Sequence, residues 1–254
     1  MIRGAGKWGL AAVLAAAITL APGAARPQSA SNKTVLEHFN IIAFGNEFTG
    51  RRYDHVRKWR QPILVGIEGK APAYFETFVL LQIRDLRRLT GHPIRLYYSP
   101  TMHREGRLPP DFDAKKINLI LYYLPVNRIP GRLARYFDND PEKVRKMIRV
   151  STCFAKFGTK KNVIRWAIAV FPSHHPKDHM RACVVEELTQ IMGLPNDSNA
   201  VKPSIFNDRS RYFELTDHDQ LMLKMLYDPR ITPGMAREEA LRQGRRILDE
   251  LNPR

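Results

Sequence analysis

Apolar residues recur every three or four positions over residues 71–90, which is the clearest helical pattern in the chain. One apolar stripe of this kind is what an amphipathic helix turns towards a core. Gly91 and Pro93 follow at once, and both residue types end helices. The spacing therefore predicts a helix over 71–90, and a shorter pattern predicts another over 34–44. The longer stripe consists of Phe75, Phe78, Val79, Ile83, Leu86 and Leu89.

Short apolar runs near Pro and Gly residues predict the strands. The most convincing run covers 117–124 and reads Ile-Asn-Leu-Ile-Leu-Tyr-Tyr-Leu. Residues 99–114 are rich in Pro, Arg and Asp, so we expect a loop there, and residues 158–161 are expected to join two strands. The other predicted strands cover 63–67, 94–98, 150–157 and 163–171.

The remaining patterns are helical. A helix is predicted to begin near Asp140, with Pro141 in its first turn, where proline is tolerated. A later one carries Val184 and Leu188 on one face and ends at Gly193. The order is strand, helix, strand, strand, helix, two strands and then helices only. It predicts an α+β domain, α/β-like in its mixed twisted sheet, with a helical C-terminal third.

The beginning of the chain has a different composition. Arg3 and Lys7 precede an apolar run over 8–21, and small residues follow up to Ala25. This is typical of a secretory signal peptide, and the run is shorter than the roughly 20 residues of a membrane span. An uncleaved anchor helix is the alternative. We expect an exported protein, periplasmic or secreted, with a signal peptide over 1–25, a flexible segment over 26–33 and one domain over 34–254.

Export makes the two cysteines informative, because disulfides persist in oxidising compartments. Cys153 and Cys183 have a single intramolecular pairing open to them. We expect a disulfide, which would stabilise the fold by about 3–4 kcal/mol in the chain-entropy description. Two buried thiols that never meet are the alternative.

The charge balance is strongly basic, with 41 Lys and Arg against 25 Asp and Glu and a net charge of +16. A DNA-binding module gathers its basic and base-reading groups on one element, whereas here they are dispersed, so we expect no nucleic-acid partner. An acidic envelope polymer or an anionic membrane surface is the expected electrostatic partner, and a merely solvated surface is the alternative. The basic clusters lie at 51–60, 84–88, 128–135, 143–149, 160–161 and 237–246.

Histidines occur in two places that invite a metal assignment. His174, His175 and His179 lie on or next to a Pro-flanked loop, where we expect surface polar residues rather than ligands. His218 lies between two acids at a predicted helix start. Acids there serve as caps and complement the helix dipole, so capping is the expected role of that group.

The segment with candidate chemistry is E-E-L-T-Q over 186–190 followed by G-L-P-N-D over 193–197. It resembles the zincin metallopeptidase helix, in which H-E-x-x-H places two zinc-binding His and a general-base Glu before a Gly turn and a third ligand. Downstream, S-I-F over 204–206 resembles the Ser-Ile-Met run of metzincins. The stretch 215–227 resembles the short closing helix that follows it.

The chain as a whole resembles a family of exported bacterial proteins described as a domain of unknown function with distant zincin similarity. The shared features are a Cys before E-E-L-x-Q, the G-L-P-N-D turn, S-I-F-N-D over 204–208 and L-Y-D-P-R over 226–230 before Pro-Gly-Met. The similarity is strongest over 183–235 and extends over 60–172 by element order. It implies a zincin-like single domain whose best-matched core covers 60–235.

The departures from the zincin motif bear on the chemistry. The resemblance assigns Glu187 to the general-base position, while Glu186 and Gln190 replace the two zinc-binding His. The third-ligand position falls on Asn196, with Asp197 beside it. Because a Gln amide is a poor zinc ligand, we expect no tightly bound zinc and name no metal ligand or cofactor. An all-oxygen set of Glu186, Gln190 and Asp197 would make only a weak Ca²⁺ or Mg²⁺ site.

Two functions remain open. The first is a non-catalytic envelope binding or scaffolding protein, in which these polar side chains hold the helix against its turn. The second is a metallopeptidase-like hydrolase, in which Glu187 activates a water near Glu186 and Gln190 and cleaves a peptide or cell-wall bond. The hydrolase predicts that these side chains and Asp197 converge on an open cleft. The scaffold predicts that they are packed away.

Overall fold

The computed structural model describes residues 31–46, 50–207, 209 and 212–253. The predicted signal peptide lies outside the described residues. The mixture of helices with a largely parallel sheet confirms the predicted α+β class. The helices are α1 (Asn32–Phe44), α2 (Ala73–Thr90), α3 (Pro100–Arg104), α4 (Ile129–Leu133), α5 (Pro141–Val150), α6 (Lys177–Gln190), α7 (Asp217–Tyr227) and α8 (Arg237–Leu251). The strands are β1 (Lys58–Trp59), β2 (Ile63–Gly69), β3 (Ile94–Tyr98), β4 (Leu119–Leu124), β5 (Phe154–Lys160) and β6 (Val163–Pro172).

Several boundaries differ from those predicted, each for a local reason. The expected loop over 99–114 contains α3, because Ser99 caps its first turn by accepting a hydrogen bond from the Met102 amide at 3.0 Å. The turn between β5 and β6 lies later than expected, at Lys161 and Asn162, which both adopt positive φ. Helix α1 begins at Asn32, so its first residues fall in the segment expected to be flexible. The pattern of apolar and polar residues does not predict β1 or α4.

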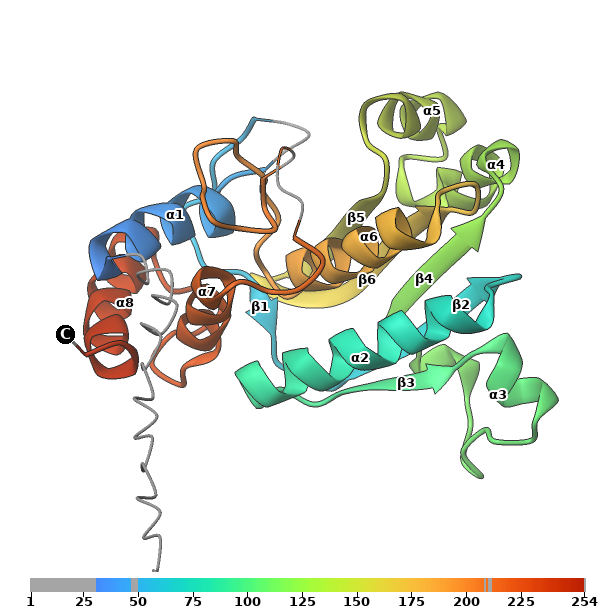
Figure 1. Cartoon of the computed structure of the whole chain (residues 1–254), viewed down its shortest axis with the longest axis horizontal. Coiled ribbons are helices and arrows are strands. Elements are labelled where there is room, and N and C mark those ends of the chain that lie inside the picture. Colours follow the sequence, from blue (N-terminus) through green and yellow to red (C-terminus); the bar gives the residue numbers. More distant parts are fainter. Residues whose placement is uncertain (1–30, 47–49, 208, 210–211, 254) are drawn as a thin grey trace, which may run out of the picture.

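The sheet has the strand order β1-β6-β4-β2-β3, and these neighbours are parallel. Strand β5 pairs antiparallel with β6. Helices α2 and α6 lie side by side across the sheet, while α4 and α5 lie together beyond the ends of β4 and β5 (Figure 1). A parallel pair needs a crossover connection, and α2 makes the one between β2 and β3.

Two hydrophobic clusters form the core, one on each side of the central strands. Along β4, Leu121 and Tyr123 join the larger cluster, and Tyr122 joins the smaller one beneath α4 and α5. Strand β6 alternates in the same way, with Ala169 in the larger cluster and Val170 in the smaller. Strands covered on both faces are apolar throughout, which explains the unbroken hydrophobic run of 119–124.

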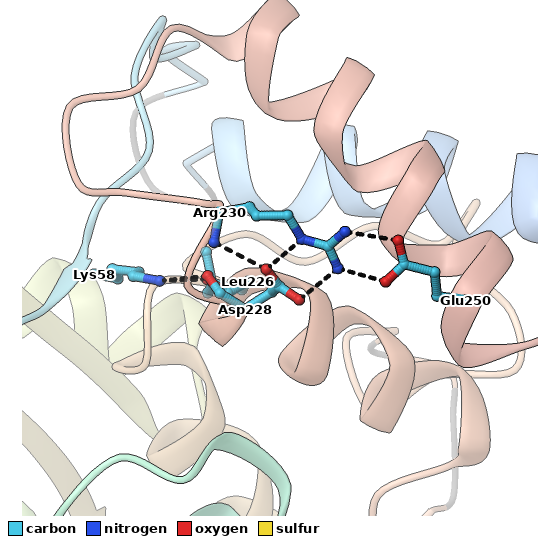
Figure 2. Close-up of polar contacts among 5 residues, drawn as sticks. All are labelled: Lys58, Leu226, Asp228, Arg230 and Glu250. Carbon is cyan, nitrogen blue, oxygen red and sulfur yellow. Dashed lines mark hydrogen bonds and ion pairs between the residues drawn. The ribbon is translucent and has the colours of Figure 1, made fainter.

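The helical C-terminal part is joined to the sheet by a polar network at the end of α7 (Figure 2). Arg230 bonds both carboxylate oxygens of Asp228 at 2.9 Å and both of Glu250 on α8 at 2.7 Å. Lys58 of β1 is buried and donates to the Leu226 carbonyl at 2.8 Å. Burial lowers the pKa of Lys58 to about 8. The L-Y-D-P-R motif is therefore a structural joint between β1, α7 and α8.

Helix α1 packs beside α8, so the two ends of the described chain lie next to each other (Figure 1). Asn32 donates to the Asp249 carboxylate at 2.9 Å and accepts from Asn252 at 2.8 Å. In the part of the chain that the structure describes, none of the helices has the length and apolar composition needed to cross a membrane.

Candidate functional site

A disulfide between Cys153 and Cys183 connects the residue before β5 to the middle of α6, as the sequence predicts. The two Cα atoms lie 5.9 Å apart, and the bond closes a sequence separation of 30 residues. It fixes the start of the antiparallel edge strand against the helix that carries the E-E-L-T-Q motif.

A cleft of about 550 Å³ opens beside this disulfide. Helix α6 contributes His179, Ala182, Cys183 and Glu186, whose spacings of three and four place them on one face of the helix. The other walls come from the end of α5 and from the segments that follow α6. The full lining is Val150, Ser151, Thr152, Cys153, His179, Ala182, Cys183, Glu186, Glu187, Asp197, Ile205, Asn207, Tyr212 and Phe213.

The cleft is acidic in an otherwise basic protein. It is lined by the carboxyl-bearing residues Glu186, Glu187 and Asp197, and among the described lining residues none is Lys or Arg. Glu187 is only 3% exposed, whereas Glu186 and Asp197 are half-buried. Three acids in one cavity favour a ligand with positive charge or many hydrogen-bond donors.

The carboxylate of Asp197 is held by the amide of Gln190. Gln190 Nε2 donates to Asp197 Oδ1 at 2.9 Å and to Oδ2 at 3.0 Å. Gln190 itself is buried and lines a second cavity rather than the acidic cleft. Gln190, the last residue of the E-E-L-T-Q motif, thus lies outside the cleft and orients the carboxylate of Asp197, which lines it.

The G-L-P-N-D turn depends on Gly193 and separates the two residues that follow Pro195. Gly193 has φ +114°, and a Cβ there would lie 2.1 Å from the Arg57 carbonyl oxygen. After this turn Asp197 faces the cleft, while Asn196 donates to the Ile41 carbonyl at 3.1 Å, at the end of α1. Asn196 is not among the residues that line the cleft.

The S-I-F-N run forms another wall of the cleft. Ser204 Oγ donates to Asp219 Oδ1 at 2.6 Å, and the Ile205 amide donates to Asp219 Oδ2 at 3.2 Å. Asp219 also forms the capping box of α7 with Thr216, which confirms the predicted capping role of this acid. Burial raises the pKa of the Asp219 carboxyl group. Ile205 and Asn207 face the cleft from this anchored segment.

The donor chemistry of the cleft is that of oxygen ligands. Glu186, Glu187 and Asp197 carry the carboxylates that Ca²⁺ and Mg²⁺ prefer. Within the described ranges, however, no three His, Cys, Asp or Glu side chains are grouped so that they would hold a metal ion together.

Five of the eight histidines lie in two separate groups. The rings of His174 and His175 have centroids 4.0 Å apart, and those of His175 and His179 are 4.8 Å apart. His175 Nε2 lies 3.1 Å from the Thr152 carbonyl oxygen, and burial lowers the pKa of this imidazole. His218 is buried and its Nε2 lies 2.8 Å from Nδ1 of His38, a pairing across 180 positions that no local pattern signals.

Two basic residues do not belong to the solvated surface. Arg57 and Lys58, which the sequence groups with the dispersed charges, are both buried. Their only sequence signal is the position between the apolar residues Val56 and Trp59. Arg57 lines the second cavity, which makes it a candidate functional residue that sequence reasoning missed.

Comparisons with known proteins return one finding. The family model described as protein of unknown function DUF2927 matches residues 32–245. No curated protein and no solved structure matches the chain.

Proposed function

The chain belongs to the DUF2927 family of proteins of unknown function, and we propose that it is an exported binding protein whose acidic cleft holds a positively charged ligand. The expected ligand is a peptide with basic side chains or a cell-wall fragment that bears a free amino group. In this proposal the domain is zincin-like in architecture, and the ligand binds where the zincin motif lies.

The charge of the cleft is the observation that carries this proposal. Glu186, Glu187 and Asp197 lie together in one cavity. Carboxylates form charge-assisted hydrogen bonds with a bound ammonium or guanidinium group. The chain has 41 basic residues, yet none of them is among the described residues that line the cleft. The charge of the cleft therefore differs strongly from that of the chain as a whole.

Two aromatic residues at the cleft support a binding role. Tyr212 and Phe213 line it, and both are exposed although they are large. An aromatic face can stack on a ligand or bind a cation through its quadrupole. These rings therefore complement the carboxylates for a ligand that carries a cation on an apolar or sugar body.

Export is part of the proposal and rests on two features. The first is the signal-peptide pattern over 1–25. The second is the Cys153–Cys183 disulfide, since disulfides of this structural kind are rare where thiols are kept reduced.

A second candidate function is hydrolysis, favoured by the position of Glu187. This residue occupies the general-base position of the zincin motif and lines the cleft while being almost fully buried. In this mechanism its carboxylate takes a proton from a water molecule as the water oxygen attacks a carbonyl carbon. The same proton then passes to the departing amine. Glu186 and Asp197 would bind the substrate rather than react.

Isothermal titration calorimetry with pentalysine and its Nε-acetylated form tests the binding proposal. We expect pentalysine to bind at least about tenfold more tightly, despite the basic net charge of the protein. Glu186→Gln and Asp197→Asn should each weaken binding, while Glu239→Gln, an exposed acid on α8, is the matched control. Equal affinity for the acetylated peptide, or an equal effect of Glu239→Gln, would refute the cleft as a cation site.

Glu187→Gln separates the two functions. If the wild-type chain releases new amino groups from a peptide or cell-wall preparation, the hydrolase requires that Glu187→Gln abolish release and retain binding. If the wild-type chain releases none but binds pentalysine, hydrolysis is rejected and the binding function stands.

A further inference from the structure

A second cavity of about 460 Å³ lies next to the acidic cleft and has the opposite charge. It is bounded by one face of α5, the middle of β5 and the turn after α6, and Gln190 forms part of its wall. None of its described lining residues is Asp or Glu. The lining is Asn46, Tyr53, Arg57, Phe137, Lys143, Lys146, Met147, Ala155, Lys156, Phe157, Gln190 and Pro195.

Arg57 is the most deeply placed cation of this cavity, at 6% exposure. Its Nη2 donates to the Ala43 carbonyl at 3.1 Å, and its guanidinium carbon lies 3.5 Å from the centre of the Tyr53 ring. Its Nε is buried and has no hydrogen-bond partner among the described residues. Burial lowers the pKa of Arg57 to about 10, so the group is still charged at neutral pH. A buried guanidinium with an N–H donor that has no partner is suited to receive an anion.

Lysines extend this positive charge along the walls. Lys156 of β5 lies with its Nζ 4.0 Å from the centre of the Phe137 ring and donates to the Tyr136 carbonyl at 2.6 Å. On α5, Lys143 and Lys146 are exposed and one turn apart, and Lys143 also pairs with Asp138 at 2.6 Å. The cavity therefore offers a buried Arg, a half-buried Lys and two exposed Lys.

The rest of the wall is apolar or aromatic. Phe137, Met147 and Phe157 all line the cavity, together with Ala155 and Pro195. A bare inorganic anion would leave these surfaces without a contact, whereas a molecule with an apolar body would cover them.

We propose that this cavity is a binding site for a small organic anion with an apolar body. Arg57 and Lys156 receive the anionic group, Lys143 and Lys146 attract it at the entrance, and Phe137 and Phe157 contact the body. Carboxylates, phosphates and sulfonates share the required chemistry. The site is separate from the acidic cleft, although Gln190 lines this cavity while it holds Asp197 on the other side.

Calorimetric titration of the purified chain with matched aromatic probes tests the site. The anions are benzoate, benzenesulfonate and phenyl phosphate; benzyl alcohol and benzylamine are the neutral and cationic controls, and inorganic phosphate lacks the apolar body. We expect at least one aromatic anion to bind with a stoichiometry of one, at least about tenfold more tightly than benzyl alcohol. Its affinity should fall with added salt. The strongest of the three anions identifies the group that the site prefers.

Two charge-removing variants on α5 locate the site. Lys146→Gln removes a lining cation, whereas Arg149→Gln removes an exposed cation from the same helix outside the cavity. We expect Lys146→Gln to weaken anion binding about three- to fivefold, and Arg149→Gln to change it less than twofold. Arg57→Met should abolish binding. Should Arg57→Met fail to fold, Lys156→Met and the α5 pair decide the outcome.

Three results would overturn the proposal. They are affinities for all three aromatic anions no greater than that for benzyl alcohol, equal effects of Lys146→Gln and Arg149→Gln, and inorganic phosphate binding as tightly as the strongest of the three anions. Glu186→Gln in the acidic cleft should leave anion affinity within twofold. Failure here is therefore distinguishable from failure of the proposed cation-binding function.

Discussion

The buried histidine pair should make the stability of this protein depend on pH. His218 of α7 is 3% exposed, and its Nε2 lies 2.8 Å from Nδ1 of His38 on α1. One ring nitrogen of the pair donates and the other accepts, so this hydrogen bond requires at least one neutral imidazole. The other nitrogen of His218, Nδ1, is buried without a hydrogen-bond partner among the described residues. Protonating both rings would place two cations between α1 and α7.

The size of the effect follows from the pKa of His218. Burial, with a smaller contribution from the charge of His38, lowers that pKa from 6.5 to about 4. The unfolded chain therefore binds more protons than the folded chain between these values. The free energy of unfolding falls as pH drops through this window, by about 3 kcal/mol in full and about 2 kcal/mol by pH 5. Burial also lowers the pKa of His38, which adds in the same direction.

Urea unfolding at pH 7.5 and pH 5 measures this directly. Between pH 7.5 and pH 5 we expect the free energy of unfolding to fall by about 2 kcal/mol more for the wild-type chain than for His218→Gln. His103→Gln, an exposed imidazole on α3, should behave as the wild type. Asp219 has a raised pKa, which favours the folded state at low pH, but it is present in every variant and cancels in the comparison. An identical pH dependence in wild type and His218→Gln would refute the reasoning.

Three further predictions concern the cleft and its supports. Reducing the Cys153–Cys183 disulfide should lower the free energy of unfolding by about 3–4 kcal/mol, read from urea midpoints with and without dithiothreitol; unchanged midpoints would mean that the bond does not restrain the unfolded chain. Gln190→Glu places a second carboxylate beside Asp197 and should lower the free energy of unfolding by about 2 kcal/mol. This decrease should be larger at pH 8 than at pH 5. A loss that grows towards low pH would contradict this. Gly193→Ala should cost at least about 2 kcal/mol and Gly91→Ala only about 1, because a Cβ meets the Arg57 carbonyl at the first site and open space at the second. Equal melting temperatures for these two variants would argue against the close approach.

Local pattern determined most of the elements, because periodicity depends only on neighbouring residues. The stripe from Phe75 to Leu89 is α2, and the apolar run at Leu119–Leu124 is β4. The local pattern did not predict strand β1, because it has only two residues. It is defined by its pairing with Val163 and Ile164 of β6, more than a hundred positions away. The disulfide needed only the presence of two cysteines.

Local pattern also located the segment that lines the cleft, since E-E-L-T-Q and G-L-P-N-D can be read without coordinates. What each side chain of that segment does depends on the folded arrangement. Asn196 and Asp197 are neighbours in the chain, yet one bonds the end of α1 and the other lines the acidic cleft. Gln190 lines a different cavity and donates hydrogen bonds to Asp197, and Arg57 is buried. Such roles depend on contacts with segments that are distant in the sequence. These contacts are set by the packing of the whole chain and not by any local pattern.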